Sequence, residues 1–217
     1  MTTQKEYWDK KINEWSSASY GRVSKISFIE KVATHFRSVE KRKDAAVKIL
    51  SRYVKGRVIL DLGCGLGEFT FDILRYKPKR VLALDISRNA VCEARLIASA
   101  QKVNKNIRFE IADVSKLKKI PACDLVVGLG FIDYLHTSQL KKLFKKIGNK
   151  PYLFSYFEKK ASLFNLLHKI YLTLQNCPGA YKYSKNEMLK MIPSTNKMYF
   201  FKKDGLMFIT NMKILAK

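Results

Sequence analysis

The sequence predicts an α/β fold in which helices cover both faces of a mostly parallel, doubly wound sheet. Two observations predict it. Between about residues 58 and 157, short apolar runs typical of buried strands alternate with segments whose apolar residues recur at helical spacing. The first apolar run is followed at once by Gly63, Gly65 and Gly67. Because such sheets bind ligands beyond the carboxyl ends of their strands, these glycines lie where a ligand is expected.

The N-terminal part is expected to be helical, since apolar residues recur at helical spacing over residues 28–54. Strands are predicted at 58–62, 80–85, 107–113, 123–130 and 151–157, and then at about 197–203 and 206–215. Helices are predicted at 67–76, from Ser87 to about Val103, from Ser138 to about Ile147, at 160–175 and near 184–191. A tight turn at Lys203-Asp204-Gly205 makes the last two strands an antiparallel hairpin, so the expected sheet has seven strands.

No Pro-, Gly- or Ser-rich linker divides the 217 residues, so one domain is expected. Its expected parts are a helical extension or lid at 1–55, a cofactor-binding core at 56–157, a cap at 158–195 and the hairpin at 196–217. No apolar stretch is long enough to span a membrane, and the N-terminus lacks the apolar segment of a signal peptide. The expected location is the cytoplasm.

The formal net charge is +24, and lysine outnumbers arginine by 32 to 10. Each of the ranges 1–57, 58–150 and 151–217 carries +8, which excludes a basic tail. Two interpretations stay open. One is a general lysine bias, and the other is a folded basic face for an anionic partner such as nucleic acid, a phosphorylated small molecule or an acidic lipid surface. The four cysteines and three histidines form no cluster with metal-ligand spacing, so no metal site is expected.

The glycine spacing discriminates between cofactors. A dinucleotide fingerprint requires a third glycine at the position of Glu68, which is charged. A P-loop requires Lys followed by Ser or Thr after its last glycine, and no such pair follows Gly67. NAD(P), FAD and ATP bound by a P-loop are therefore disfavoured.

The stretch VILDLGCGLGEFT at 58–70 resembles the first motif of the class I S-adenosylmethionine-dependent methyltransferases, in particular those of the small-molecule type. The resemblance continues in register through VLALDIS at 81–87, IRFEIADVSKL at 107–117 and CDLVVGLGFIDYL at 123–135. It implies a Rossmann-like seven-stranded sheet with an antiparallel C-terminal hairpin. It also implies an enzyme that uses S-adenosylmethionine as its methyl donor.

The resemblance assigns cofactor contacts to residues at the ends of the first three strands. Asp85 would accept hydrogen bonds from the ribose hydroxyls, and Asp113 would receive the adenine amino group. Asp61 would lie behind the glycines, near the ammonium end of the cofactor. Further candidates for the cofactor site are Gly63, Cys64, Gly65, Gly67, Ile86, Val114, Gly128, Tyr20 and Arg22, the last two as candidates to reach the cofactor carboxylate.

The sequence says less about which molecule accepts the methyl group. The chain has no Asp/Asn-Pro-Pro-aromatic sequence and no Pro-Cys dipeptide, the usual signatures of amino-group methylation of nucleic acids or glutamine and of cytosine-C5 methylation. After the fourth strand, Asp133, Tyr134 and His136 are candidates to polarise or deprotonate an acceptor hydroxyl. The alternatives are that His136 caps the next helix and that Tyr134 belongs to the core. The apolar segment 161–175 is expected to cap the site, or else to contact a lipid-tailed acceptor or a membrane surface.

Three functions remain open. The favoured one is transfer of a methyl group to a small-molecule acceptor, with oxygen as the expected nucleophile. The second is methylation of RNA, which requires a contiguous basic surface around the mouth of the pocket. The third is a non-catalytic module that binds S-adenosylmethionine in a regulatory role.

Overall fold

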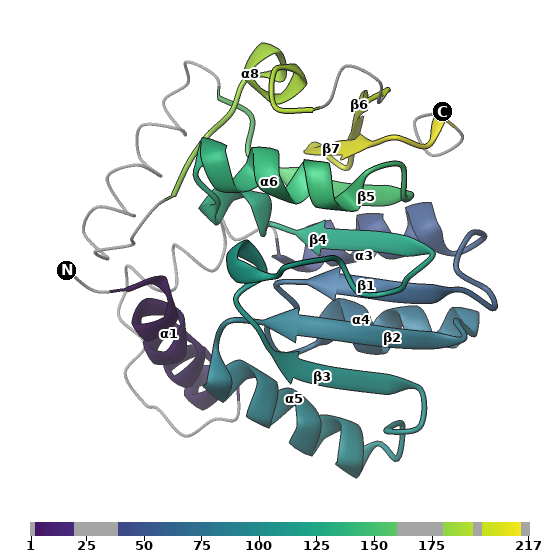
Figure 1. Ribbon diagram of the computed structural model, residues 1–217. Coiled ribbons are helices and arrows are strands. Elements are labelled where there is room, and N and C mark those ends of the chain that lie inside the picture. Colours follow the sequence, from purple (N-terminus) through teal and green to yellow (C-terminus); the bar gives the residue numbers. More distant parts are fainter. Residues whose placement is uncertain (1–2, 20–38, 160–179, 193–196, 214–217) are drawn as a thin grey trace.

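The computed structural model describes residues 3–19, 39–159, 180–192 and 197–213. These residues form a seven-stranded sheet with the strand order β3-β2-β1-β4-β5-β7-β6 and with helices packed against it (Figure 1). The strands β1 to β5 are parallel, whereas β7 runs antiparallel to both of its neighbours. The predicted fold class is confirmed.

The strands are β1 (Val58–Leu62), β2 (Arg80–Asp85), β3 (Ile107–Ile111), β4 (Leu125–Leu129), β5 (Tyr152–Tyr156), β6 (Tyr199–Lys203) and β7 (Leu206–Thr210). The chain runs outward from β1 to β3 and then returns to place β4 on the other side of β1. In this pairing Asp61 of β1 lies opposite Val127 of β4. The loops that follow β1 and β4 therefore meet at the same edge, at the point where the strand order reverses and where such sheets bind ligands.

The helices are α1 (Gln4–Ser19), α3 (Val39–Leu50), α4 (Glu68–Ile73), α5 (Arg88–Ala100), α6 (Thr137–Ile147) and α8 (Lys185–Leu189), with short 3-10 turns η1 (Leu74–Tyr76), η2 (Val114–Lys116) and η3 (Ile132–Tyr134). Because successive strand residues point to opposite faces, the sheet buries apolar side chains on both sides. Ile59 and Val81 pack with α3 and α4, and Ala83 packs with α5. On the other face, Leu60 and Leu84 pack with residues of α6 and α8.

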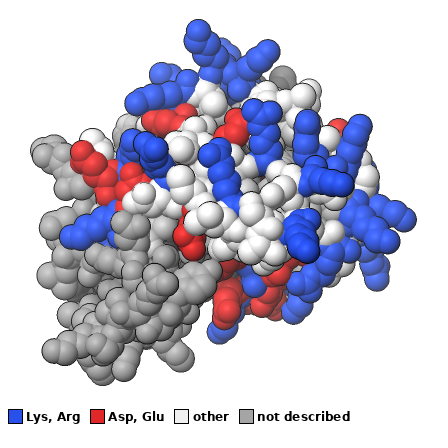
Figure 2. Space-filling view, turned by 90° about the horizontal axis from the view of Figure 1, so that it is seen from below, with Lys and Arg blue, Asp and Glu red and all other residues white. Residues whose placement is uncertain are grey.

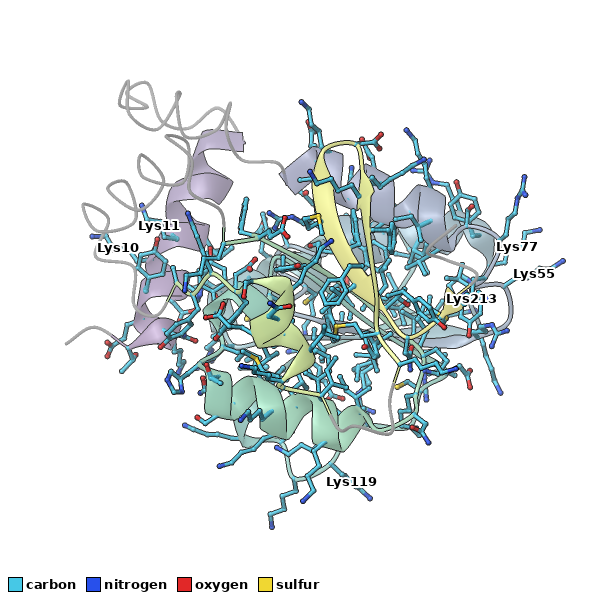
Figure 3. The ribbon with its side chains drawn as sticks, turned by 90° about the horizontal axis from the view of Figure 1, so that it is seen from above. Lys10, Lys11, Lys55, Lys77, Lys119 and Lys213 are labelled. Carbon is cyan, nitrogen blue, oxygen red and sulfur yellow. The ribbon has the colours of Figure 1, made fainter. Side chains whose placement is uncertain are left out.

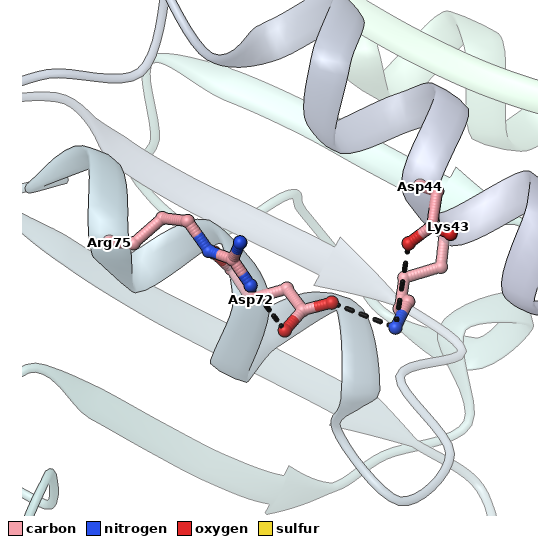
Figure 4. A network of polar contacts seen from close by, with 4 residues as sticks. All are labelled: Lys43, Asp44, Asp72 and Arg75. Atoms are coloured by element: carbon pink, nitrogen blue, oxygen red, sulfur yellow. Dashed lines mark hydrogen bonds and ion pairs between the residues drawn. The ribbon is translucent and has the colours of Figure 1, made fainter.

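Ion pairs fasten α3 to α4 (Figure 4). The Nζ atom of Lys43 lies 2.8 Å from Oδ2 of Asp72, and Nη2 of Arg75 lies 3.0 Å from Oδ1 of the same carboxylate. Burial opposes ionisation of Asp72, but its hydrogen bond with Lys43 and the two cations outweigh burial and lower its pKa. This network fixes the helix that also carries Arg42, a residue of the candidate site described below.

Helix α1 lies beyond the carboxyl ends of β2 and β3, next to the start of α5 (Figure 1). Tyr7 and Ile12 of this helix are buried. The N-terminal extension therefore lies at the edge of the sheet where the strands end.

Most predicted elements are present with shorter bounds. The strand predicted at 107–113 ends at Ile111, and the helix predicted at 67–76 is divided into α4 and η1. Helix α6 begins at Thr137, one residue before the predicted start at Ser138. His136 is its N-cap, which confirms one of the two alternatives for this residue, because its side chain accepts a hydrogen bond from Ser138 N–H and Gln139 closes the capping box. Residues 28–38 and the segment 160–175, both predicted to be helical, lie outside the described residues.

Positively charged side chains are distributed over many sides of the described surface. Figure 2 shows Lys and Arg over most of one face, with smaller groups of Asp and Glu between them. In Figure 3, Lys10 and Lys11 lie on α1, Lys119 lies below α6, and three labelled lysines lie at the far end of the sheet. The even spread of charge along the sequence therefore has a counterpart in space.

Candidate active site at the carboxyl edge of the sheet

The loop after β1 is a tight turn with left-handed backbone. Gly63, Gly65 and Gly67 have φ values of 72°, 54° and 85°. Such values favour glycine because a Cβ atom destabilises the left-handed conformation. The N–H groups of Gly63 and Cys64 donate to the carbonyl oxygen of Leu84 at 2.8 and 3.1 Å. The loop is thus tied to the end of β2 before the chain enters α4.

The three glycines have different surroundings. A Cβ atom on Gly63 would lie 2.8 Å from Cδ2 of Phe131, and one on Gly67 would lie 2.8 Å from the ring of Phe109. A Cβ atom on Gly65 would meet no atom of the described chain within 4 Å. The open side of the loop is therefore at Gly65, whereas the other two glycines also make room for aromatic rings.

Asp85 ends β2 and supports this loop. Its Oδ2 accepts a hydrogen bond from Gly65 N–H at 2.8 Å, and its Oδ1 accepts one from Ser87 N–H at 2.9 Å. Burial raises the pKa of Asp85 and the nearby charge of Asp9 adds to this, while the backbone N–H groups favour the ionised form. Each carboxylate oxygen has two lone pairs. Asp85 can therefore hold the loop and still accept hydrogen bonds from a ligand.

Asp61 lies on the side of β1 that α4 covers. Its side chain is buried, and its Oδ2 accepts a hydrogen bond from Thr70 Oγ1 at 2.7 Å. Burial raises the pKa of Asp61 to about 7. Asp61 thus lies behind the glycine loop, and its side chain is held by a hydrogen bond from α4.

Asp113 follows β3 and caps the turn η2. Its Oδ1 accepts hydrogen bonds from the backbone N–H and the hydroxyl of Ser115 at 3.0 and 2.6 Å, and its Oδ2 lies 3.4 Å from Nζ of Lys116. The next residue, Val114, is buried, and Ile86 after β2 is half-buried. These residues lie along the same edge as Asp85, because β2 and β3 are paired in parallel.

Four other residues were predicted to contact the cofactor, namely Gly128, Cys64, Tyr20 and Arg22. Gly128 lies inside β4, where a Cβ atom would be 2.8 Å from the ring of Phe154. Burial raises the pKa of Cys64, so its thiol is neutral. Tyr20 and Arg22 lie outside the described residues.

Helix α1 crosses the loop after β1. Oδ1 of Asp9 accepts hydrogen bonds from Ser87 Oγ at 2.6 Å and from Asn89 N–H at 3.2 Å, at the start of α5. The ring of Trp8 packs edge-on against Tyr134, with 4.9 Å between centroids, and Gln4 Nε2 donates to the carbonyl oxygen of Tyr134 at 2.6 Å. Since β1 lies between β2 and β4, a helix that contacts the loops after both of these strands covers the glycine loop between them.

Beyond β4, the turn η3 places Asp133 in a buried polar position. Its Oδ1 accepts a hydrogen bond from Phe157 N–H at 2.9 Å, and its carbonyl oxygen accepts one from Tyr181 N–H at 2.7 Å. Oδ2 is buried and has no hydrogen-bond partner in the part of the chain that the structure describes. Burial raises the pKa of Asp133 to about 6, although the charges of Arg42 and Lys182 favour ionisation.

Arg42 of α3 is a candidate that the sequence analysis missed. Its guanidinium lies 4.9 Å from the centroid of the Phe157 ring, and a Cβ atom on Gly130 would lie only 1.7 Å from its Nη1. The side chain is buried, and this burial lowers its pKa while Asp133 opposes the effect. In the stretch EKRKD, no local pattern distinguishes Arg42 from the exposed Lys41. The sequence offered no signal for it.

The other two acceptor candidates lie nearer the surface. His136 is exposed; its Nδ1 caps α6, and its ring lies edge-on to Tyr181 with 5.5 Å between centroids. Tyr134 is half-buried against Trp8. Of the three predicted residues, Asp133 is the one that the fold encloses most.

The described residues fit an adenosyl cofactor. Gly65 leaves open space beside the loop, Asp85 has oxygen atoms for hydroxyl donors, and α1 covers this position. Among these same residues there is no group of three or more His, Cys, Asp or Glu side chains that could hold a metal ion. None of the described helices is long and apolar enough to cross a membrane.

Comparison with known proteins also points to a methyltransferase domain in the central part of the chain. Residues 59–149 match a family model described as a methyltransferase domain. The chain is also similar to phosphoethanolamine N-methyltransferase 1 of Triticum aestivum, with 28% identity over 147 residues. That match covers 66% of this chain and 27% of the relative, so the chain spans about a quarter of the length of this relative.

Solved structures share the fold over most of the chain. Magnesium protoporphyrin IX methyltransferase from Synechocystis PCC 6803, solved with bound S-adenosylhomocysteine (SAH), has a TM-score of 0.68 and 19% identity over 95% of each chain. The PH0226 protein of Pyrococcus horikoshii OT3 has a TM-score of 0.62 and 19% identity over 80% of this chain and 90% of that one. At these identities the likeness shows the fold alone.

Proposed function

We propose that this protein methylates a small molecule, because residues 59–149 match a methyltransferase domain model and the chain has a Rossmann-like fold of the class I type. The methyl donor is S-adenosylmethionine, and the favoured nucleophile is an oxygen atom. One observation carries the proposal. The loop after β1 is open at Gly65 and is held from beneath by the carboxylate of Asp85.

The cofactor supplies a methyl group already activated on its sulfonium, so the protein has to bind, orient and exclude water. In this proposal Asp85 accepts the ribose hydroxyls, and Asp113 with Val114 and Ile86 borders the adenine. Asp61 lies behind the glycine loop on the side of the cofactor ammonium group. Helix α1 excludes water, because it bridges the loops after β2 and β4.

The relatives support a small-molecule acceptor of undetermined kind. Their names specify phosphoethanolamine in one case and magnesium protoporphyrin IX in the other. The described surroundings of η3 are aromatic and polar, with Trp8 on Tyr134 and the Arg42 guanidinium on Phe157. A compact aromatic site suits a small molecule better than it suits a nucleic acid strand held by its phosphates.

Two measurements test this proposal. Calorimetry should show that the protein binds S-adenosylmethionine and SAH; if it binds neither, the proposal is wrong. Radiolabelled S-adenosylmethionine should then be incubated with the protein and a cell extract divided into small-molecule, RNA and protein fractions. We expect label in the small-molecule fraction. Label confined to RNA would instead support the second function predicted from the sequence.

A further inference from the structure

We propose that Asp133 and Tyr156 bind the hydroxyl group of an uncharged alcohol or phenol acceptor, and that Asp133 takes its proton. This inference rests on the proposed methyl-transfer function and specifies the chemical class of the acceptor. Tyr156, the last residue of β5, was not a candidate in the sequence analysis.

Two buried polar atoms carry the proposal. Oδ2 of Asp133 and the hydroxyl of Tyr156 are both buried, and neither has a hydrogen-bond partner among the described residues. Leaving such a group unpaired costs about 1–3 kcal/mol, so native proteins seldom do so without a ligand or a water molecule there. The hydroxyl of Tyr152 is also buried and unpaired within the described chain, but it lies at the amino end of β5, away from the ligand-binding edge.

Asp133 and the end of β5 are joined through the backbone at that edge. Phe157, which follows Tyr156, donates its N–H to the other oxygen of Asp133 at 2.9 Å. The Tyr156 side chain also interacts electrostatically with Asp133. Burial raises the pKa of Tyr156, and the charges of Glu158 and Asp133 raise it further. Asp133 is thus held through Oδ1 and its backbone, while Oδ2 remains for a ligand.

This pair lies near the cofactor loop. Phe131 belongs to the same segment as Asp133, and its ring is so close to Gly63 that a Cβ atom there would be 2.8 Å away. The segment that presents Asp133 therefore packs directly on the loop after β1. An acceptor at Oδ2 would lie on the side of the sheet edge where the methyl group is expected.

The surrounding charges select among acceptor groups. An uncharged hydroxyl can donate to Oδ2 of Asp133 and accept from the hydroxyl of Tyr156, so it satisfies both atoms. A carboxylate acceptor has no proton to donate, so it would leave Oδ2 of Asp133 unpaired. An ammonium acceptor has no free lone pair, and it would lie in the field of Arg42 and Lys182, both of which interact with Asp133.

The proposed step balances in atoms and charge. Oδ2 takes the hydroxyl proton, and an oxygen lone pair of the acceptor forms the new C–O bond to the methyl carbon. The C–S bond breaks, and its electron pair stays on sulfur. The products are a methyl ether, SAH and protonated Asp133, which then releases its proton to solvent. A carboxyl group with a pKa of about 6 is ionised at neutral pH and can act in this way.

Three probes of similar size test the acceptor class on protein saturated with SAH: phenol, benzoate and benzylamine. Ligand-observed NMR should show that phenol binds most tightly of the three. Asp133→Asn and Tyr156→Phe should each weaken phenol binding by about tenfold, because each removes one hydrogen bond to the probe. Tyr152→Phe is the matched control: it removes an equally buried hydroxyl at the other end of β5 and should leave phenol binding unchanged.

The pH dependence gives a second readout. Phenol binding to the wild type should weaken as the pH falls through about 6, since Asp133 then becomes protonated. Besides burial, the groups that act on this titration are Arg42 on α3, the N–H of Phe157 and Lys182. The Asp133→Asn variant should lose this dependence while it still folds and binds SAH.

Several results would overturn the inference. The first is equal phenol binding by the wild type and Asp133→Asn, which would mean that a buried water satisfies Oδ2. The second is tighter binding of benzoate or benzylamine than of phenol. The third is no binding of any probe to the SAH complex. All of these leave the proposed function intact as long as SAH binds. Failure of SAH to bind would instead contradict the proposed function itself.

Discussion

The loops after β1, β2 and β3 and the loops after β4 and β5 share one edge of the sheet, yet they are built differently. In the first group, polar contacts join residues of neighbouring strand ends, such as Gly65 with Asp85. In the second group, Asp133 is surrounded by Phe157, Tyr181 and Arg42. They come from the residue after β5, from the chain after residue 179 and from α3. A cofactor site can therefore be encoded by local motifs, whereas the acceptor site depends on distant segments.

The acidic residues of the two groups differ in the same way. Both oxygen atoms of Asp85 accept hydrogen bonds from backbone N–H groups, which hold the carboxylate ready for a ligand. Asp133 has one oxygen held by Phe157 N–H and one oxygen unpaired within the described residues. Backbone N–H groups thus preorganise the proposed cofactor side, whereas the proposed acceptor side keeps a buried oxygen atom that a ligand could satisfy.

The largest expected effect is on the cofactor side. Asp85→Ala should weaken SAH binding by about 100-fold, because it removes two charge-assisted hydrogen bonds to the ribose and also releases Gly65 N–H. Calorimetry measures the affinity, and chemical unfolding of the same variant separates binding from stability. Glu110→Ala on the neighbouring strand is the control, since Glu110 pairs with the exposed Arg108. Equal losses in both variants would contradict the assignment.

A smaller effect should separate the glycines. Gly65→Ala should weaken SAH binding by about tenfold while destabilising the fold by about 1 kcal/mol, because the new Cβ atom points into open space and its main structural cost is the left-handed backbone. Gly63→Ala should destabilise more, since its Cβ atom would also meet Phe131. Parallel calorimetry and unfolding measurements check both. If Gly65→Ala bound SAH normally, the open side of the loop would not be the cofactor site.

The N-terminal helix should contribute less again. Asp9→Ala removes the acceptor for Ser87 Oγ and Asn89 N–H, so undocking of α1 should become easier by about 1 kcal/mol. We expect SAH to dissociate about fivefold faster, as measured by stopped-flow fluorescence. Lys10→Ala changes the neighbouring exposed residue and serves as the control. An unchanged dissociation rate in Asp9→Ala would show that α1 does not close over the cofactor.

The smallest effect is expected on the outer face of α6. Lys141, Lys142 and Lys145 are exposed there, while the opposite side of the helix packs into the core. Replacing the three by glutamine should change SAH affinity and small-molecule methylation by less than about twofold, because exposed charges away from a site are screened by salt. A fall in methylation of RNA with a reduced salt dependence would contradict this and favour a nucleic acid acceptor.

Much of the fold was predictable because its signals are local. The five parallel strands and the final hairpin were predicted from apolar runs and turn residues, and the structure confirms the fold class, with the ends shifted by a few residues. The start of α6 differs by one residue from the prediction, and the sequence left open whether His136 caps this helix or acts on the acceptor. Helix ends depend on single side-chain contacts, which a sequence pattern does not resolve.

Most candidate cofactor residues were predicted because they stand next to a strand end in a recognisable motif. Asp85 and Asp113 come directly after apolar runs, and Gly65 lies in a spaced glycine loop. Arg42 and Tyr156 could not be found in this way. One is a basic residue in a charged helix, and the other is an aromatic residue in an apolar strand. Their burial and their neighbours exist only after distant segments meet.

The α/β architecture, the order of its main elements and the position of the glycine loop follow from local sequence patterns, because hydrophobic period and backbone preference act over a few neighbouring residues. Only the folded chain shows which glycine is open, how α1 crosses the loop, and which polar atoms near β4 and β5 are enclosed without a partner in the described chain. These properties depend on burial and on contacts between α1, α3, η3 and β5. Desolvation and packing are produced by the folded assembly and cannot be read from any one segment.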